Sequence, residues 1–211
     1  AVLLFLDAQD VRGALVGGEQ VRAGVGFDEG ADGIGAAEEA VETARAHVAE
    51  LIGAEASEIL FTSGATESNN LAIKGAARFA ARQETDRRRV VTVATEHKCV
   101  LESVRDLAAE GFEPVVLPVR PDGLLDPDLL EASLAERPTL LVSVMAVNNE
   151  IGVIQDLAAI GEIAKRHGAL FHTDAAQAAG RMPLDVGAIR ADLLSISGLS
   201  LIHISEPTRL R

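Results

Sequence analysis

Short apolar segments alternate with amphipathic segments along most of the chain. The apolar segments are nearly continuous, which is typical of strands buried on both faces of a parallel sheet. They cover residues 58–62, 90–94, 114–119, 139–147, 169–173 and 192–196. Apolar residues recur at helical spacing in the segments 36–53, 66–82, 99–110, 127–136 and 156–167. The pattern therefore predicts an α/β fold with a mostly parallel sheet sandwiched by helices.

Composition and charge exclude several classes of partner. With 19 Lys and Arg against 32 Asp and Glu, the chain has a net charge of −13 and repels phosphate backbones, so we expect no nucleic-acid partner. A single Cys excludes an intrachain disulfide and a cysteine-based metal cage, and it fits a reducing compartment such as the cytoplasm. No apolar run reaches the ~20 residues of a membrane helix, so we expect no membrane partner. We also expect no metal site.

Polar residues gather where four of the predicted strands end. These clusters are residues 63–70, 95–99, 148–152 and 174–177. In parallel α/β sheets, ligands bind at the carboxyl ends of the strands, and these ends share one edge of the sheet. We therefore expect the four clusters to lie around one binding site.

Each cluster has both a functional and a structural interpretation. A helix that begins after Ser63 and Thr66 offers free N–H groups to a phosphate, but either side chain could simply cap the helix. His97 could stack on a flat ligand, move protons or be structural. Asn149 belongs to a pair of Asn residues that could donate hydrogen bonds to a ligand or could build a turn. Asp174 could be a buried carboxylate that serves a ligand, or it could cap a helix.

Taken together, the clusters favour pyridoxal 5'-phosphate (PLP) as the cofactor. The phosphate of PLP needs a helix N-terminus, and its pyridine nitrogen needs an acidic partner so that the ring can withdraw electrons. Its ring oxygen needs a hydrogen-bond donor. The four clusters supply a phosphate cradle, a ring-stacking His, amide donors and a carboxylate.

Residues 36–198 resemble the cysteine desulfurases of the class-V aminotransferases. The resemblance is carried by FTSGATESNNLAIKG at 61–75, TEHK at 95–98, VNNEIG at 147–152, HTDAAQ at 172–177 and SISG at 195–198. It implies the large domain of a PLP-dependent transferase of the aspartate aminotransferase-like fold, fold type I, here incomplete. We expect a divergent segment at 1–35 before this domain and a non-native tail at 199–211, which is similar to translated sequencing-adapter sequence.

The resemblance also implies a role for seven residues. Ala65, Thr66 and Ser197 would hold the phosphate of PLP. His97 would stack over the pyridine ring and act as the catalytic residue.

Three of these seven residues would bind the edge of the ring. Asn149 and Gln177 would bond the side of the ring that carries the hydroxyl group. Asp174 would pair with the pyridine nitrogen.

The reaction implied by the resemblance removes sulfur from L-cysteine. It gives alanine and an enzyme persulfide, whose sulfur passes to iron–sulfur clusters or thiolated cofactors. The implied partners are a second copy of the chain, in a homodimer, and a sulfur acceptor or iron–sulfur scaffold protein.

Two departures from the family pattern predict that the chain as written is inactive. The family continues Ser-Gly-His-Lys, and that Lys binds PLP covalently, whereas Ser197 and Gly198 are followed by Leu199 and Ser200. The family's loop with the nucleophilic Cys lies beyond the sequence given. We expect Cys99, at a helix start that favours a thiolate, to be an ordinary helix residue.

Three alternatives remain open. Selenocysteine lyase or another class-V PLP enzyme would share the cofactor and differ in substrate. A non-catalytic α/β module would hold a phosphorylated ligand or a protein partner. A nicotinamide-dependent oxidoreductase is disfavoured because no Gly-x-Gly-x-x-Gly loop follows a strand.

Overall fold

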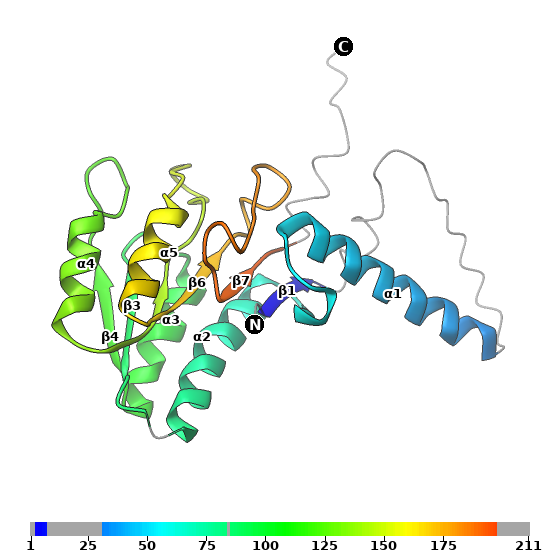
Figure 1. The fold of residues 1–211 in the computed structure, drawn as a ribbon, viewed down its shortest axis with the longest axis horizontal. Coiled ribbons are helices and arrows are strands. Elements are labelled where there is room, and N and C mark those ends of the chain that lie inside the picture. The colour runs from blue at the N-terminus through cyan, green and yellow to red at the C-terminus, as the bar shows by residue number, and fades with distance from the viewer. Residues whose placement is uncertain (1–2, 8–30, 84, 198–211) are drawn as a thin grey trace, which may run out of the picture.

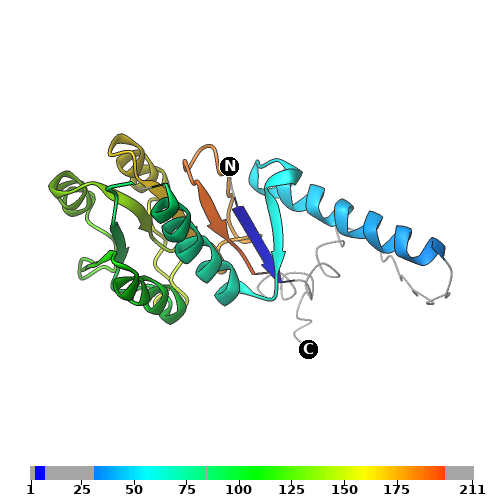
Figure 2. The same cartoon turned by 90° about the horizontal axis from the view of Figure 1, so that it is seen from below.

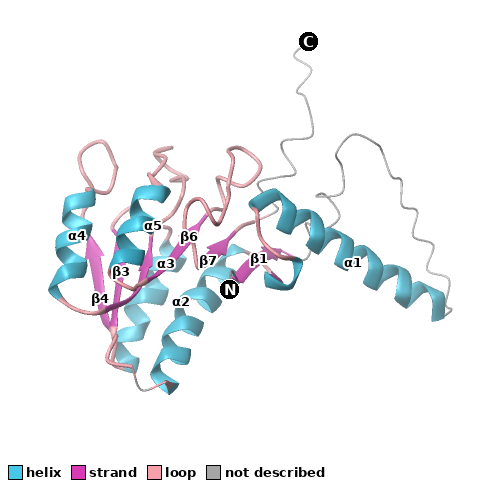
Figure 3. Ribbon diagram, viewed as in Figure 1, coloured by secondary structure: helices cyan, strands magenta, loops and turns pink. Residues whose placement is uncertain are grey.

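The computed structural model describes residues 3–7, 31–83 and 85–197, and its central feature is a seven-stranded sheet (Figure 3). All neighbouring strands are parallel, and their order is β2-β1-β7-β6-β5-β3-β4. The strands are β1 (Leu3–Asp7), β2 (Ile59–Thr62), β3 (Arg89–Val93), β4 (Glu113–Leu117), β5 (Thr139–Ser143), β6 (Leu170–Asp174) and β7 (Leu193–Ser195). The parallel α/β fold predicted from the apolar segments is therefore confirmed.

Helices cover both faces of the sheet (Figure 1). The helices are α1 (Ala31–Ile52), α2 (Ala65–Arg82), α3 (Lys98–Asp106), α4 (Pro127–Glu136) and α5 (Leu157–Arg166), with short 3-10 helices at Ala56–Glu58 and Leu107–Glu110. Helices α4 and α5 lie on one face, and α2 and α3 lie on the other. The amino-terminal part of α1 projects away from the sheet (Figure 2). Within the described ranges, no helix combines the length and the apolar character needed to cross a bilayer.

Alternation along the strands divides the core into two apolar layers. On β3, Val90 packs with α2 and α3, whereas Val91 packs with the layer that includes α4 and α5. Leu141 and Val142 of β5 divide in the same way. Successive side chains of a strand point to opposite faces, so a strand buried on both sides is apolar at most of its positions. This is why these strands appear in the sequence as continuous apolar runs.

Two elements differ from those expected. Strand β5 ends at Ser143, although the apolar run continues to residue 147. Beyond Ser143 the Met145 N–H donates to the Glu96 carboxylate, whereas the N–H groups of Val144 and Ala146 still donate to His172 and Asp174 of β6. Strand β1 was not expected, because its five residues lie in the weakly periodic segment 1–35. The tail expected at 199–211 lies outside the described residues, and the domain boundaries stay a prediction.

Candidate functional site

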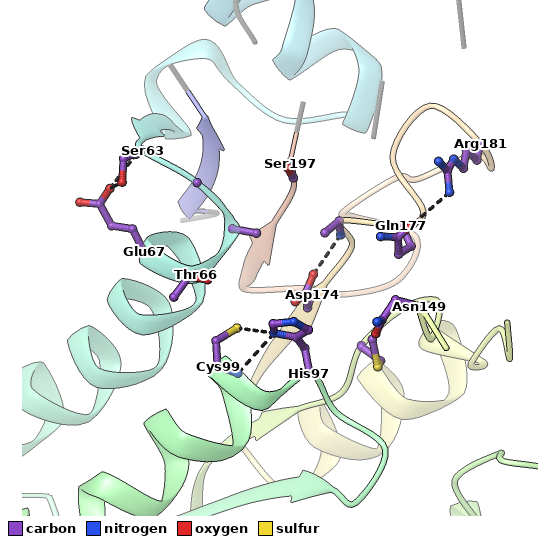
Figure 4. A pocket seen from close by; sticks show the side chains of 14 residues that line it. Ser63, Thr66, Glu67, His97, Cys99, Asn149, Asp174, Gln177, Arg181 and Ser197 are labelled. Atoms are coloured by element: carbon purple, nitrogen blue, oxygen red, sulfur yellow. Dashed lines mark hydrogen bonds between the residues drawn. The ribbon is translucent and has the colours of Figure 1, made fainter. Parts of the chain in front are cut away.

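An open pocket of about 630 Å³ lies where the carboxyl ends of the central strands meet the N-termini of α2 and α3 (Figure 4). The structure brings all seven residues expected at a cofactor to the wall of this one pocket. They are Ala65, Thr66, His97, Asn149, Asp174, Gln177 and Ser197. The expectation that the four polar clusters surround one site is therefore confirmed, while the role of each residue stays a prediction.

The N-terminus of α2 opens into the pocket without a side-chain cap. Gly64 is the N-cap residue, and within the described part of the chain no side chain caps the free N–H groups of the first turn. The backbone N–H and the hydroxyl of Ser63 instead both donate to Glu67, at 2.6 Å each. Capping by Ser63 or Thr66, the structural alternative, is therefore not what the structure shows. The first N–H groups of a helix have no partner within the helix, and they suit an anion such as phosphate.

His97 joins the pocket to the start of α3. It is the N-cap residue of α3, and its Nδ1 accepts the backbone N–H of Cys99 at 3.3 Å. The Cys99 Sγ lies 3.0 Å from the same nitrogen. Because Nδ1 is occupied as an acceptor, the hydrogen of the neutral imidazole is on Nε2. A proton exchanged with a ligand would therefore pass through Nε2.

Cys99 lies on the wall of the pocket, beside His97. Its Sγ also accepts Asn69 Nδ2 at 3.4 Å. Burial is the main cause that raises the pKa of the Cys99 thiol. The expectation that a helix start favours a thiolate here is wrong, because desolvation of the sulfur outweighs the dipole of the helix. The thiol is therefore neutral, and its contact with His97 is its clearest role.

Asp174 is a buried carboxylate at the carboxyl end of β6, with 5% of its surface exposed. Its Oδ2 accepts Asn69 Nδ2 at 2.7 Å, and its Oδ1 accepts the Ala176 N–H at 2.9 Å. It begins a turn rather than a helix, so it is not a helix cap.

Burial raises the pKa of Asp174, and the hydrogen bonds from Ala176 and Asn69, followed by the nearby His97, partly lower it. The ion pairs among the described residues give Asp174 no Lys or Arg partner. A desolvated carboxylate without a cationic side chain is costly, and a cationic ligand group would relieve that cost. A protonated ring nitrogen fits this position.

The two Asn residues at the end of the β5 segment have different tasks. Asn148 is buried, and its Oδ1 accepts the N–H groups of Glu150 and Ile151 at 2.8 Å each. It therefore builds the turn, which was the structural interpretation of the pair. Asn149 is exposed, and it faces the pocket (Figure 4).

Gln177 takes its orientation from Arg181, four residues later. Arg181 Nη1 donates to Gln177 Oε1 at 2.9 Å. A guanidinium group only donates hydrogen bonds, so the Gln177 oxygen faces Arg181 and its NH₂ group remains available to the pocket. Arg181 also lines the pocket, and it was not expected from the sequence.

Two further polar residues beside the site were also not expected. Asn69 and Glu96 are buried, and they contact Asp174 and Met145, respectively. Both lie inside stretches that carry the family resemblance, but nothing in the sequence distinguishes them from surface residues. The available signal was the cost of burying a polar group, which requires knowing that the position is buried. Among the described residues, no cluster of His, Cys, Asp and Glu suits a metal ion.

Comparison with known proteins gives one family and a consistent set of relatives. Residues 29–201 match the family model "Aminotransferase class-V". The chain is 53% identical over 184 residues to "Cysteine desulfurase IscS" of Tolumonas auensis, covering 83% of this chain and 44% of that protein. It is 57% identical over 162 residues to the protein of the same name from Ehrlichia chaffeensis, covering 77% of this chain and 38% of that protein. The chain thus spans less than half the length of these relatives.

Solved structures agree with this assignment. "SspA in complex with cysteine" matches with a TM-score of 0.76 and 35% identity, over 94% of this chain and 56% of that one. The crystal structure of DndA from Streptomyces lividans matches with a TM-score of 0.71 and 41% identity, over 82% of this chain and 47% of that one. The chain therefore belongs to the class-V aminotransferase family, and the relatives that it matches at high identity are cysteine desulfurases.

Proposed function

We propose that the pocket binds PLP and that the chain is part of the large domain of a cysteine desulfurase. The observation that carries this proposal is the pairing of two opposite features within one pocket. At one side, the uncapped N-terminus of α2 attracts an anion. At the other, Asp174 is a buried carboxylate that needs a cation. A ligand with a phosphate at one end and a protonated ring nitrogen at the other satisfies both.

The residues of the chain would divide the work of binding. The first N–H groups of α2, at Ala65 and Thr66, hold the phosphate together with Ser197. Asp174 would keep the ring nitrogen protonated, because a buried carboxylate and a cation beside it stabilise each other's charged forms. When bound, PLP supplies an electron sink for bonds broken at the substrate's α-carbon.

The remaining polar residues would orient the ring and move a proton. His97 stacks on the ring and exchanges a proton at Nε2, because its Nδ1 is held by the start of α3. Asn149 and the NH₂ group of Gln177 donate to the ring oxygen.

For the whole protein, we propose that L-cysteine is the substrate and that its sulfur leaves as a persulfide. The support is the identity to proteins named cysteine desulfurase and the match to a structure solved with cysteine. The proposal includes a cytoplasmic homodimer that passes sulfur to an acceptor or iron–sulfur scaffold protein.

A second candidate is a non-catalytic module that holds PLP or another phosphorylated ligand. It is favoured by one observation, which is that no Lys lines the pocket among the described residues. The position where the family has its PLP-binding Lys is Ser200, and it lies outside the described residues.

A binding experiment with two substitutions tests the proposal. We expect the 211-residue chain to bind PLP saturably, and pyridoxal, which lacks the phosphate, at least about tenfold more weakly. The variant Ser200→Lys should gain a borohydride-reducible link to PLP at residue 200, found by peptide mapping, while Ser63→Lys, which puts a Lys at the wall of the pocket beside α2, should not. Equal binding of pyridoxal would contradict the phosphate cradle. PLP binding without a link at residue 200 would favour the non-catalytic module.

A further inference from the structure

Glu96 is a buried carboxyl group just behind the pocket, and it does not line it. It is 6% exposed and lies between Thr95 and His97, in the turn that follows β3. Its Oε1 accepts the backbone N–H of Met145 at 2.6 Å. Its Oε2 is buried without a hydrogen-bond partner among the described residues. A group as polar as a carboxyl is rarely buried unless it holds something in place.

The bond to Met145 joins two turns that carry expected site residues. Met145 begins the segment that leads to Asn149, whereas Glu96 directly precedes His97. A second hydrogen bond joins the same two turns, from Asn148 Nδ2 to the Thr95 carbonyl oxygen, at 2.7 Å. The two turns are thus tied at two points, and both ties are buried or partly buried.

We propose that Glu96 is a positioning residue, which fastens the turn that carries His97 to the turn that carries Asn149 so that both face the same pocket. The Met145 N–H lies beyond the last residue of β5, and Glu96 is its acceptor. A buried N–H without an acceptor costs free energy, so losing the carboxyl group would release the Met145 segment from the His97 turn.

The hydrogen bond from Met145 lowers the pKa of Glu96, but two other causes act in the opposite direction. Burial first, and the charge of Asp174 second, raise the pKa of Glu96 well above its ordinary value. An uncharged carboxyl still accepts the Met145 N–H through its carbonyl oxygen, and it adds no negative charge beside Asp174. Gln has the same shape and the same acceptor, so Glu96→Gln should keep the fastening, whereas Glu96→Leu should lose it.

The single Cys of the chain provides a readout that needs no PLP. Cys99 Sγ lies 3.0 Å from His97 Nδ1, so its rate of alkylation by iodoacetamide under native conditions reports how firmly the His97 turn is held. We expect Glu96→Leu to raise this rate by about tenfold and Glu96→Gln to stay within about twofold of the unsubstituted chain. Amide hydrogen exchange at Met145 should follow the same order, with slow exchange in the unsubstituted chain and in Glu96→Gln.

Two control variants separate a local release from general destabilisation. Leu130→Ala removes a buried side chain of α4, which belongs to neither turn, and it lowers global stability. Glu102→Ala removes an exposed carboxylate on the same helix as Cys99. At matched unfolding midpoints, alkylation in Glu96→Leu should still exceed that in Leu130→Ala.

Two results would contradict the positioning role of Glu96. Equal alkylation rates in Glu96→Leu and in Leu130→Ala at matched stability would overturn it, as would fast Met145 exchange in the unsubstituted chain. If Glu96→Leu does not fold, Glu96→Asp replaces it, because the shortened side chain keeps the carboxyl group but loses the reach to Met145. The inference rests on the proposed function only in naming what the pocket holds. A failure to bind PLP would therefore leave these readouts intact.

Discussion

His172 and Asp174 are two buried polar residues on the same strand, and they have opposite relations to their surroundings. They are two positions apart on β6, so they point to the same face of the sheet, the one covered by α2. His172 is in the interior, where its Nδ1 pairs with Ser143 Oγ at 2.8 Å and its Nε2 with Ser195 Oγ at 3.0 Å. Asp174 lies two residues further along β6, at the carboxyl end of the strand and on the wall of the pocket.

The difference shows how a single strand serves the fold and the site. Burial lowers the pKa of His172 to about 3, so the ring is neutral, and both of its nitrogens have partners within the protein. Asp174 has N–H donors but no cationic side chain, and burial raises its pKa. A satisfied neutral group stabilises the sheet, whereas an incompletely balanced acidic group can still gain from a ligand.

The substitution Asp174→Asn should produce the largest change. It keeps the shape of the side chain but removes the charge that would pair with a protonated ring nitrogen. Breaking a buried charge pair costs about 3–5 kcal/mol, so we expect PLP affinity to fall by at least about 100-fold. Equilibrium titration monitored by PLP absorbance measures this. The control is Asp106→Asn, which changes an exposed carboxylate. Similar PLP affinities in the two variants would show that Asp174 does not bind the ligand and so does not differ from His172 in this way.

The substitution His172→Ala should affect stability rather than binding. It leaves a cavity in the sheet and removes a partner from two buried serine hydroxyls, so we expect a loss of about 2–3 kcal/mol in the free energy of unfolding. Urea denaturation measures the loss. In the fraction that remains folded, PLP affinity should change by less than about threefold, because His172 does not line the pocket. A large loss of affinity without a loss of stability would place His172 in the site instead.

The two residues should also give stability an opposite dependence on pH. The pKa of His172 is depressed in the folded state, so below pH ~6.5 the unfolded chain takes up a proton that the folded chain refuses. Stability from this residue is present above pH ~6.5 and falls by about 1.4 kcal/mol per pH unit as the pH drops toward 3. The pKa of Asp174 is raised, so its contribution is greatest at low pH and is lost as the pH rises above ~3.9.

Unfolding curves of three chains across pH 4–8 separate these contributions. Relative to the unsubstituted chain, the deficit of His172→Ala should shrink as the pH falls. Asp174→Asn should instead gain in relative stability as the pH rises. Parallel curves for all three chains would contradict both assignments.

The substitution Arg181→Ala should have the smallest effect. Arg181 is exposed and acts on the pocket through the Gln177 oxygen. Exposed contacts of this kind contribute about 0.2–1 kcal/mol, so PLP affinity should fall by at most about fivefold. In Gln177→Ala the same substitution at Arg181 should have no further effect, because the orienting contact is already gone. Independent, additive losses would show that Arg181 contacts the ligand by another route.

The sequence indicated the fold because of how its strands are buried. Strands covered on both faces leave continuous apolar runs, and five helical segments with clear periodicity separate them. The site residues were found because parallel strands bring their carboxyl ends to one edge, so short polar clusters at those ends had to meet. Strand β1 was missed because its five residues lie in a segment without clear periodicity.

The sequence by itself indicated the elements from residue 36 onward and the edge of the sheet where the pocket lies, because hydrophobic period and strand-end chemistry are local properties; the family resemblance added seven of the residues at its wall. Only the tertiary structure decided the state of each polar group. Helix position favoured a thiolate at Cys99, but burial keeps it a thiol. His172 and Asp174 belong to one strand, yet only packing shows that the first is satisfied by two serines and that the second has no cationic partner among the described residues. Desolvation and partner geometry depend on residues far apart in the chain, and so they become visible only when the chain is folded.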